Sequence, residues 1–260
     1  MHNRTPRWIE RGTQGDTVSL SGKRALITGA SGSLGAAIAQ RLARDGATVL
    51  LHASSRPAAI EQLAAAIVAA GGTAECHVFD LRSDEGTAAG CVDMLKGGPV
   101  QIIVNNAGVH DDAVMPGMRA EQWHKVIDVS LNGFFRVTQP LLLPMLRTRW
   151  GRILNISSVA ALTGNRGQVN YAAAKGALNS ATKALSLEVA SRGVTVNAIA
   201  PGIIASPMAD AVFDAALIQQ LVPVKRAGRP EEVAALAGFL ASDEAAYITG
   251  QVISINGGMV

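Results

Sequence analysis

Short apolar runs alternate with segments of helical spacing along most of this chain, and this alternation restricts the possible folds more than any other feature. The runs are residues 25–27, 48–53, 75–79, 100–104, 153–156, 195–200 and 252–255. Strands that alternate with helices build a parallel sheet covered on both faces. A chain of 260 residues with 48% hydrophobic content can bury such a sheet in one core. We therefore predict an α/β fold, a doubly wound parallel sheet of the Rossmann type, in one domain over residues 21–260.

Two segments depart from this alternation. Residues 1–20 are polar with little periodicity, and we expect a flexible N-terminal extension. Residues 203–221 follow the sixth predicted strand without forming a simple strand–helix unit. An insertion at the carboxyl end of a strand lies beside the ligand site of such folds, so we predict a substrate lid here. Pro140 and Pro144 are expected to kink or restart the helix that contains them.

Composition argues against several classes of protein. The 23 Lys and Arg residues barely exceed the 20 Asp and Glu residues, which does not suggest a nucleic-acid partner. No apolar run has membrane-spanning length, and the five histidines lack metal-ligand spacing. Cys76 and Cys91 fall in a predicted strand and helix, where buried thiols are expected rather than a disulfide. We expect a cytoplasmic enzyme without a catalytic metal.

A glycine-rich turn follows the first predicted strand. Residues 28–35 read Thr-Gly-Ala-Ser-Gly-Ser-Leu-Gly and lead directly into a helix. Glycine lets the backbone approach a pyrophosphate, and the helix N-terminus offers it free N–H groups. The turn predicts a dinucleotide site; the alternative is an ordinary glycine-rich turn between strand and helix.

The end of the second predicted strand bears on the choice of dinucleotide. Sites that prefer NAD place Asp or Glu there to bind the ribose 2′-hydroxyl. This chain has Ala53 followed by Ser54, Ser55 and Arg56. Small hydroxyls and a cation suit a 2′-phosphate, so NADP(H) is predicted. The alternative for Arg56 is a solvated loop arginine.

Other chemically distinctive residues follow further strands. Asp80, the segment 105–108 (Asn-Asn-Ala-Gly) and Ser158 each stand just after a predicted strand. Ligands of doubly wound sheets bind outside the carboxyl ends of the strands. These residues and the glycine turn are therefore expected to meet at one edge of the sheet.

Ser158, Tyr171 and Lys175 form the candidate catalytic group. Tyr171 and Lys175 are four residues apart in a predicted helix, so they share a face. A lysine cation would lower the phenol pKa from its ordinary value near ~10 toward a useful acid–base range. The Ser158 hydroxyl could hold a carbonyl oxygen beside the phenol. The spacing alone also fits an ordinary helix.

Taken in order, these motifs resemble the short-chain dehydrogenase/reductase family over about residues 20–260. The residues that carry the resemblance are Thr28, Gly29, Gly35, Asn105, Asn106, Ala107, Gly108, Ser158, Tyr171, Lys175, Pro201 and Gly202. Segments 164–171 and 247–259 are similar to bacterial 3-oxoacyl-acyl-carrier-protein reductases. The resemblance implies NADPH-dependent reduction of a 3-oxoacyl thioester to the 3-hydroxyacyl form, in fatty acid or related polyketide-like synthesis, by a homotetramer.

The resemblance also implies roles for individual residues. Tyr171 would be the general acid, Ser158 would orient the ketone, and Lys175 would hold the nicotinamide ribose and tune the Tyr171 pKa. The remaining cofactor contacts would come from the glycine turn and from the other strand ends: Gly29, Ser31, Gly32, Ser33, Leu34, Gly35, Asp80, Leu81, Asn106, Ala107, Gly108, Pro201, Gly202, Ile204 and Ser206. Asp80 and Leu81 would meet the adenine, and Ile204 and Ser206 the nicotinamide amide.

The chain departs from the family pattern at two places. Ser33 replaces a usual glycine, and Gly32 stands where many NADP-dependent members have a basic residue. Ser130 occupies the position of an asparagine that holds a proton-relay water in the family. Three outcomes stay open at Ser130: the serine holds the water differently, Asn132 compensates, or turnover is reduced.

The implied partner is an acyl carrier protein, which is acidic. Arg149 and Arg192 stand at the family's docking positions, and cations near the mouth of the site would suit such a partner. Solvated arginines at helix C-termini are the plainer interpretation. Two other functions stay open: an NADPH-dependent reductase of a different ketone, sugar or secondary metabolite, and a cofactor-binding protein with little turnover.

Overall fold

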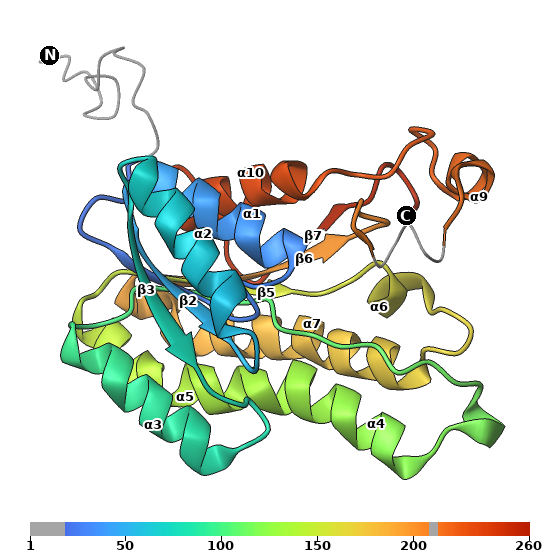
Figure 1. Ribbon diagram of the computed structural model, residues 1–260, viewed down its shortest axis with the longest axis horizontal. Coiled ribbons are helices and arrows are strands. Elements are labelled where there is room, and N and C mark those ends of the chain that lie inside the picture. The colour runs from blue at the N-terminus through green and yellow to red at the C-terminus, as the bar shows by residue number, and fades with distance from the viewer. Residues whose placement is uncertain (1–18, 208–212) are drawn as a thin grey trace, which may run out of the picture.

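The computed structural model describes residues 19–207 and 213–260. The predicted extension lies outside these residues except for its last two positions, as does the middle of the predicted lid. Seven parallel strands form one sheet in the order β3-β2-β1-β4-β5-β6-β7, and this confirms the predicted doubly wound α/β fold (Figure 1). The strands are β1 Arg24–Ile27, β2 Thr48–Ala53, β3 Thr73–Val78, β4 Ile102–Asn105, β5 Gly151–Ile156, β6 Val194–Pro201 and β7 Val252–Ile255.

Helices cover both faces of this sheet (Figure 1). The first layer contains α1 (Ser33–Arg44), α2 (Pro57–Ala69) and α10 (Pro230–Ala241). The second contains α3 (Asp84–Lys96), α5 (Gly133–Arg147) and α7 (Val169–Val189). The shorter elements are η1 (Met115–Gly117), α4 (Ala120–Ile127), η2 (Asp128–Asn132), α6 (Ala160–Thr163), η3 (Ala190–Arg192) and α9 (Ala215–Leu221). No helix in the described part is both long and apolar enough to cross a membrane.

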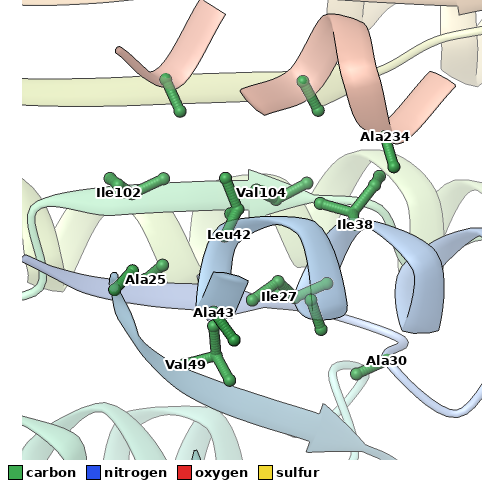
Figure 2. Packing of buried hydrophobic residues seen from close by; sticks show 14 of the residues in the cluster. Ala25, Ile27, Ala30, Ile38, Leu42, Ala43, Val49, Ile102, Val104 and Ala234 are labelled. Carbon is green, nitrogen blue, oxygen red and sulfur yellow. The ribbon is translucent and has the colours of Figure 1, made fainter. Parts of the chain in front are cut away.

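The two helical layers are held by alternate residues of each strand. In β1, Ala25 and Ile27 pack into the layer of α1, and Leu26 packs into the layer of α3. Figure 2 shows the first of these cores, where Ile38 and Leu42 of α1 approach the strands. Each such fully buried aliphatic side chain contributes ~1.5–3 kcal/mol. This packing fixes the start of α1 against the end of β1, where the glycine turn lies.

The structure departs from two local expectations: the helix does not restart at its prolines, and one of the two cysteines is not buried. Helix α5 runs through Pro140 and Pro144 without a break. A π-helical turn, η2, precedes it, so the change of helical register occurs before the prolines. Cys76 is exposed because β3 is an edge strand, whereas Cys91 is buried as predicted; both thiols are free.

Candidate active site

The ends of β1 and β4 are joined at the carboxyl edge of the sheet. The Thr28 hydroxyl accepts the backbone N–H groups of Asn106 and Ala107, both at 3.0 Å. The Asn106 side-chain amide donates to the carbonyl oxygens of Thr28 at 2.9 Å and Gly29 at 3.2 Å. The predicted cofactor residue Asn106 therefore has a bracing role: its amide holds the glycine turn in place.

Two of the three glycines in the turn are required by its geometry. Gly29 has φ +67°, and a Cβ there would lie 3.0 Å from the Ala107 Cα. A Cβ on Gly35 would lie 2.5 Å from the Gly29 carbonyl oxygen. Gly32 is different, because its Cβ would meet only the Gly29 oxygen, at 3.6 Å. A larger side chain thus fits at Gly32 but not at Gly29 or Gly35.

The turn fits the pyrophosphate of a dinucleotide. The N-cap of α1 is Gly32, which has no side chain to bind the first N–H groups of the helix. These N–H groups and the positive end of the helix dipole are available to an anion. Because Gly35 lies so close to the Gly29 carbonyl oxygen, no side chain at position 35 can enter the space where the pyrophosphate would bind. Ser31, Ser33 and Leu34 line the same turn and are partly or fully exposed.

A histidine that the sequence analysis did not single out forms a hydrogen bond to the glycine turn. His52, at the end of β2, is buried and accepts the Gly29 backbone N–H on Nδ1 at 3.3 Å. Its Nε2 lies 2.9 Å from the Phe79 carbonyl oxygen, and its ring contacts the Phe79 ring at 4.2 Å. Burial lowers the pKa of His52 to about 4, so the ring is neutral, with the proton on Nε2.

Ser54, Ser55 and Arg56 lie together beside the turn. All three are exposed, and Arg56 Nη2 donates to the Ser31 hydroxyl at 3.3 Å. No acid follows β2, so nothing at this position repels a 2′-phosphate. The arrangement fits NADP(H).

The residues after β3 have different environments. Asp80 forms an ion pair with Arg82 at 2.7 Å, and this hydrogen-bonded arginine lowers the Asp80 pKa. Leu81 is buried in the core, and its carbonyl oxygen accepts from Arg136 at 3.3 Å. The Leu81 side chain is therefore a core residue, and only its backbone could meet an adenine.

Ser158, Tyr171 and Lys175 lie together at the end of β5 and the start of α7. The Ser158 hydroxyl lies close enough to the Tyr171 phenol to lower its pKa. Lys175 is buried, donates from Nζ to the Ile156 carbonyl oxygen at 2.7 Å, and holds Nζ 5.8 Å from the centre of the Tyr171 ring. The Ser158 hydroxyl also accepts the Ala160 N–H at 3.1 Å, which fixes its position.

The electrostatics of this group differ from the prediction. Burial lowers the pKa of Lys175 to about 8, because the ammonium loses its water. Desolvation raises the Tyr171 pKa above 10.0, while the nearby Ser158 hydroxyl opposes that rise and Asp112 adds to it. The expected lowering of the Tyr171 pKa by Lys175 is therefore wrong. Burial dominates, and the hydrogen bond that Lys175 makes goes to the backbone.

Ser130 lies in η2 and faces the same region. Its buried hydroxyl has no hydrogen-bond partner among the described residues. A Cβ on Gly108 would lie 3.2 Å from Lys175 Nζ and 3.6 Å from Ser130 Oγ, so both polar groups border Gly108. Asn132 does not compensate for the family asparagine, because its amide donates to Asp128 at 2.6 Å.

The remaining cofactor candidates follow β6. The Pro201 carbonyl oxygen accepts the Val159 N–H at 2.8 Å, and the Gly202 N–H donates to Ile255 at 3.0 Å. A bridge to Gly228 holds Ile204, and the half-buried Ser206 follows. Residues 208–212 of the predicted lid lie outside the described part. Helix α9, within the segment predicted to be a lid, has no buried residue.

The two candidate docking arginines lie elsewhere. Arg149 precedes β5 and Arg192 precedes β6, at the amino ends of strands whose carboxyl ends carry the site. The two segments are neighbours, since the Gly151 N–H donates to the Gly193 carbonyl oxygen at 3.3 Å. The six residues of β5 span about 20 Å. The expectation that these arginines lie at the mouth of the site in their own chain is wrong.

Comparison with known proteins agrees with this geometry. Residues 29–260 match the family model described as enoyl-(acyl carrier protein) reductase. The 3-oxoacyl-[acyl-carrier-protein] reductase FabG of Pseudomonas aeruginosa is 45% identical over 93% of this chain and 99% of its own. Nodulation protein G of Rhizobium sp. is 43% identical over 92% and 98%. A crystal structure of a candidate gluconate dehydrogenase from Agrobacterium tumefaciens has a TM-score of 0.89 at 32% identity, covering 93% of this chain and 97% of its own.

The family match spans most of the chain, and the relatives align over nearly their full length. The glycine turn at residues 29–35 and the absence of an acidic residue directly after β2 suit NADP(H). The chain belongs to the short-chain dehydrogenase/reductase family, and it is an oxidoreductase that uses NADP(H).

Proposed function

We propose that this enzyme reduces a 3-oxoacyl thioester, carried by an acyl carrier protein, to the 3-hydroxyacyl thioester in fatty acid or related polyketide-like synthesis. The single observation that carries the proposal is that the Ser158 hydroxyl and the Tyr171 phenol lie together beside the buried Lys175. Two hydroxyls converging on one point suit a carbonyl oxygen that becomes a hydroxyl. The names of the relatives in Pseudomonas aeruginosa, Synechocystis and Vibrio harveyi specify this substrate.

The proposed chemistry divides between the cofactor and the chain. When bound, the reduced nicotinamide supplies the hydride. Ser158 holds the ketone oxygen, and Tyr171 donates its phenolic proton to that oxygen. Lys175, whose pKa burial lowers to about 8, lies beside the phenolate that remains and helps return a proton to it. Ser130, whose buried hydroxyl has no partner in the described part of the chain, could hold a water in this return path.

The chain offers contacts along the whole length of the dinucleotide. The turn from Gly29 to Gly35 would hold the pyrophosphate, and Ser54, Ser55 and Arg56 the 2′-phosphate. Asp80 and the Leu81 backbone would meet the adenine, and Gly108 the adjoining ribose. Ile204 and Ser206 would bind the nicotinamide amide, with Pro201 and Gly202 setting their approach. Residues 21–260 would form one reductase domain, with residues 203–221 as the substrate lid.

A homotetramer in the cytoplasm is part of this proposal. Several large apolar side chains are exposed on the described chain, and subunit contacts would cover them: Phe135, Leu143, Leu187 and Tyr247. If Arg149 and Arg192 dock the carrier protein, they must serve the active site of a neighbouring subunit. Because these arginines lie at the opposite edge of the sheet, a carrier protein bound to them could not reach the active site of the same subunit by a short route.

Oxidation of NADPH with three substrates tests the proposal. A 3-oxoacyl group on an acyl carrier protein, a small 3-oxoacyl thioester and a matched 2-enoyl thioester are compared. The proposal expects the carrier-bound ketone to give the highest kcat/KM and the enoyl thioester no turnover. Turnover of the enoyl thioester alone would assign the activity that the family model's description names.

Two other functions have specific support. The candidate gluconate dehydrogenase shares the fold at 32% identity, so a hydroxy acid or sugar could be the substrate. Activity on such a compound, without activity on thioesters, would favour this reading. Ser130, in place of an asparagine, is compatible with a cofactor-binding protein of little turnover. Binding of NADPH without reduction of any ketone would support that reading.

A further inference from the structure

His110 lies directly against the candidate acid. Its imidazole centroid is 4.2 Å from the centroid of the Tyr171 ring, and the two planes are inclined by 31°. Aromatic pairs at this separation contribute ~0.5–1.5 kcal/mol beyond the area that they bury. The sequence analysis counted His110 only among the five histidines that lack metal-ligand spacing.

The loop that carries His110 is fastened to the start of α7. The Asn170 amide, on α7, donates to the Asp111 carbonyl oxygen at 2.9 Å. The Ala113 N–H donates to the Gly167 carbonyl oxygen at 2.9 Å. The Asp111 carboxylate binds Gln122 at 2.8 Å and Lys125 at 2.9 Å. His110 is thus placed by the same segment that places Tyr171.

A glutamine fixes the imidazole itself. Gln168 Nε2 donates to Asp112 at 2.8 Å and lies 3.4 Å from His110 Nδ1. Gln168 Oε1 accepts from Asn165 at 2.9 Å, which settles the orientation of the amide. An amide nitrogen facing Nδ1 favours the neutral ring with its proton on Nε2. Burial lowers the His110 pKa, Asp112 raises it and Lys175 lowers it, so the net direction also favours the neutral ring.

We propose that His110 is a positioning residue for Tyr171: its ring shields one side of the phenol from water and holds it in register with Ser158. This inference rests on the role of Tyr171 in the proposed function. Desolvation is the largest influence on the Tyr171 pKa, and a ring stacked at 4.2 Å is a source of it. A phenol kept dry and fixed delivers its proton to one defined oxygen.

Titration of the phenol tests this without any substrate. The chain has two tyrosines, and Tyr247 is fully exposed, so Tyr247→Phe leaves Tyr171 as the only phenol. In that background the phenolate is followed by near-ultraviolet absorbance. His110→Ala should bring the Tyr171 pKa down toward 10.0, whereas His110→Phe should keep it raised. The exposed His124, changed to Ala, is the control and should leave the titration unchanged.

Kinetics supply the second measurement. His110→Ala should lower kcat by roughly 3–10-fold, because the phenol is no longer held in one position toward the carbonyl oxygen, and it should leave NADPH affinity unchanged. His110→Phe should stay close to the parent. An unchanged titration and kcat in His110→Ala would overturn the proposal, and so would equal damage in His110→Phe. Should His110→Ala fail to fold, His110→Gln, which also lacks a ring, carries the same expectation.

The two measurements separate this inference from the proposed function. If the thioester is not the substrate, kcat on it is uninformative, but the phenol titration still reports on the stack. If the titration changes as expected and no ketone is reduced, the proposed function fails and the positioning contact stands. If reduction proceeds and the titration is unmoved by His110→Ala, the positioning contact fails alone.

Discussion

The backbone N–H of Gly29 donates to Nδ1 of the buried His52 at 3.3 Å. This bond joins the first glycine of the cofactor turn to the end of β2. This bond requires a neutral imidazole with its proton on Nε2. The Nε2–H group then donates to the Phe79 carbonyl oxygen at 2.9 Å. Protonation of Nδ1 would replace the acceptor with a donor and break the link.

His52 should therefore make stability depend on pH. Its pKa is lowered from 6.5 to about 4, so the unfolded state binds the extra proton between these values. Stability is at its full value above pH 6.5 and falls as the pH drops toward 4, by up to about 3 kcal/mol. Urea unfolding at pH 7 and pH 5 should show a smaller difference in His52→Asn than in the parent. If the stability difference between pH 7 and pH 5 is the same in His52→Asn as in the parent, groups other than His52 cause the pH dependence. His124→Asn, at an exposed histidine, is the control.

Tyr171→Phe should remove reduction while leaving NADPH binding nearly unchanged. Only the proton donor is lost, and a positioned general acid contributes roughly 10²–10⁴-fold to the rate. Single-turnover oxidation of NADPH and a separate binding titration measure the two effects. Tyr247→Phe, at the fully exposed second tyrosine, is the matched control and should be neutral. Most of the activity surviving in Tyr171→Phe would remove this residue from the mechanism.

Much of the fold was predictable because most strands are buried apolar runs and several helices carry one apolar face. The order of the elements and the bounds of β2 and β7 agree with the apolar pattern. The same pattern could not reveal η2, because a π-helical turn keeps nearly the same apolar spacing as the helices beside it. The exposure of Cys76 depends on which strand lies at the edge, and that is a property of the whole sheet.

The candidate site was predictable in its membership but not in its contacts. Sequence motifs select Ser158, Tyr171 and Lys175, and the structure brings them together. His52 and His110 were missed as site residues because each acts through tertiary contacts: one accepts the Gly29 N–H, and the other stacks on Tyr171. The signal that could have found them is their position, directly before or after a strand end that carries a motif. The pKa shift of Tyr171 depends on burial, which residue spacing does not report.

NADPH should be preferred over NADH through Arg56 and its serine neighbours. Arg56 is exposed, so its loss in Arg56→Ala should weaken kcat/KM for NADPH by only roughly 3–10-fold and leave NADH unchanged. Gly32→Arg should strengthen the preference, because a side chain at this position meets only one atom, at 3.6 Å. Equal efficiency of the parent enzyme with both cofactors would contradict the prediction.

Ser130→Asn should hold or raise turnover. The parent hydroxyl is buried and has no partner within residues 19–207 and 213–260, whereas an asparagine side chain is longer and carries its donor and acceptor on separate atoms. Turnover and its dependence on pH are compared with those of Ser130→Ala, which should be no better than the parent. A large loss in Ser130→Asn, in a protein that still folds and binds NADPH, would show that the serine belongs to a different network.

The carrier protein gives the last prediction. Arg149 and Arg192 are exposed neighbours at the amino edge of the sheet, where each precedes a central strand. An acidic partner held there would gain ~0.5–1 kcal/mol from each ion pair, so losing both arginines should weaken use of a carrier-bound substrate ~5–30-fold. Reversal in Arg149→Glu, Arg192→Glu should cost more, through repulsion, and high salt should reduce the loss.

The control for this variant is Arg44→Glu. Arg44 is exposed and is the last residue of α1, in the other helical layer. A small thioester should be reduced as well as before in both variants, because neither change touches Tyr171. Docking at this edge also requires the substrate to reach another subunit, since about 20 Å of β5 separates the arginines from Ser158 in one chain. A dissociated subunit should therefore reduce the carrier-bound substrate no better than the small thioester. Equal losses on carrier-bound and small substrates in the double variant would mean that these arginines are structural.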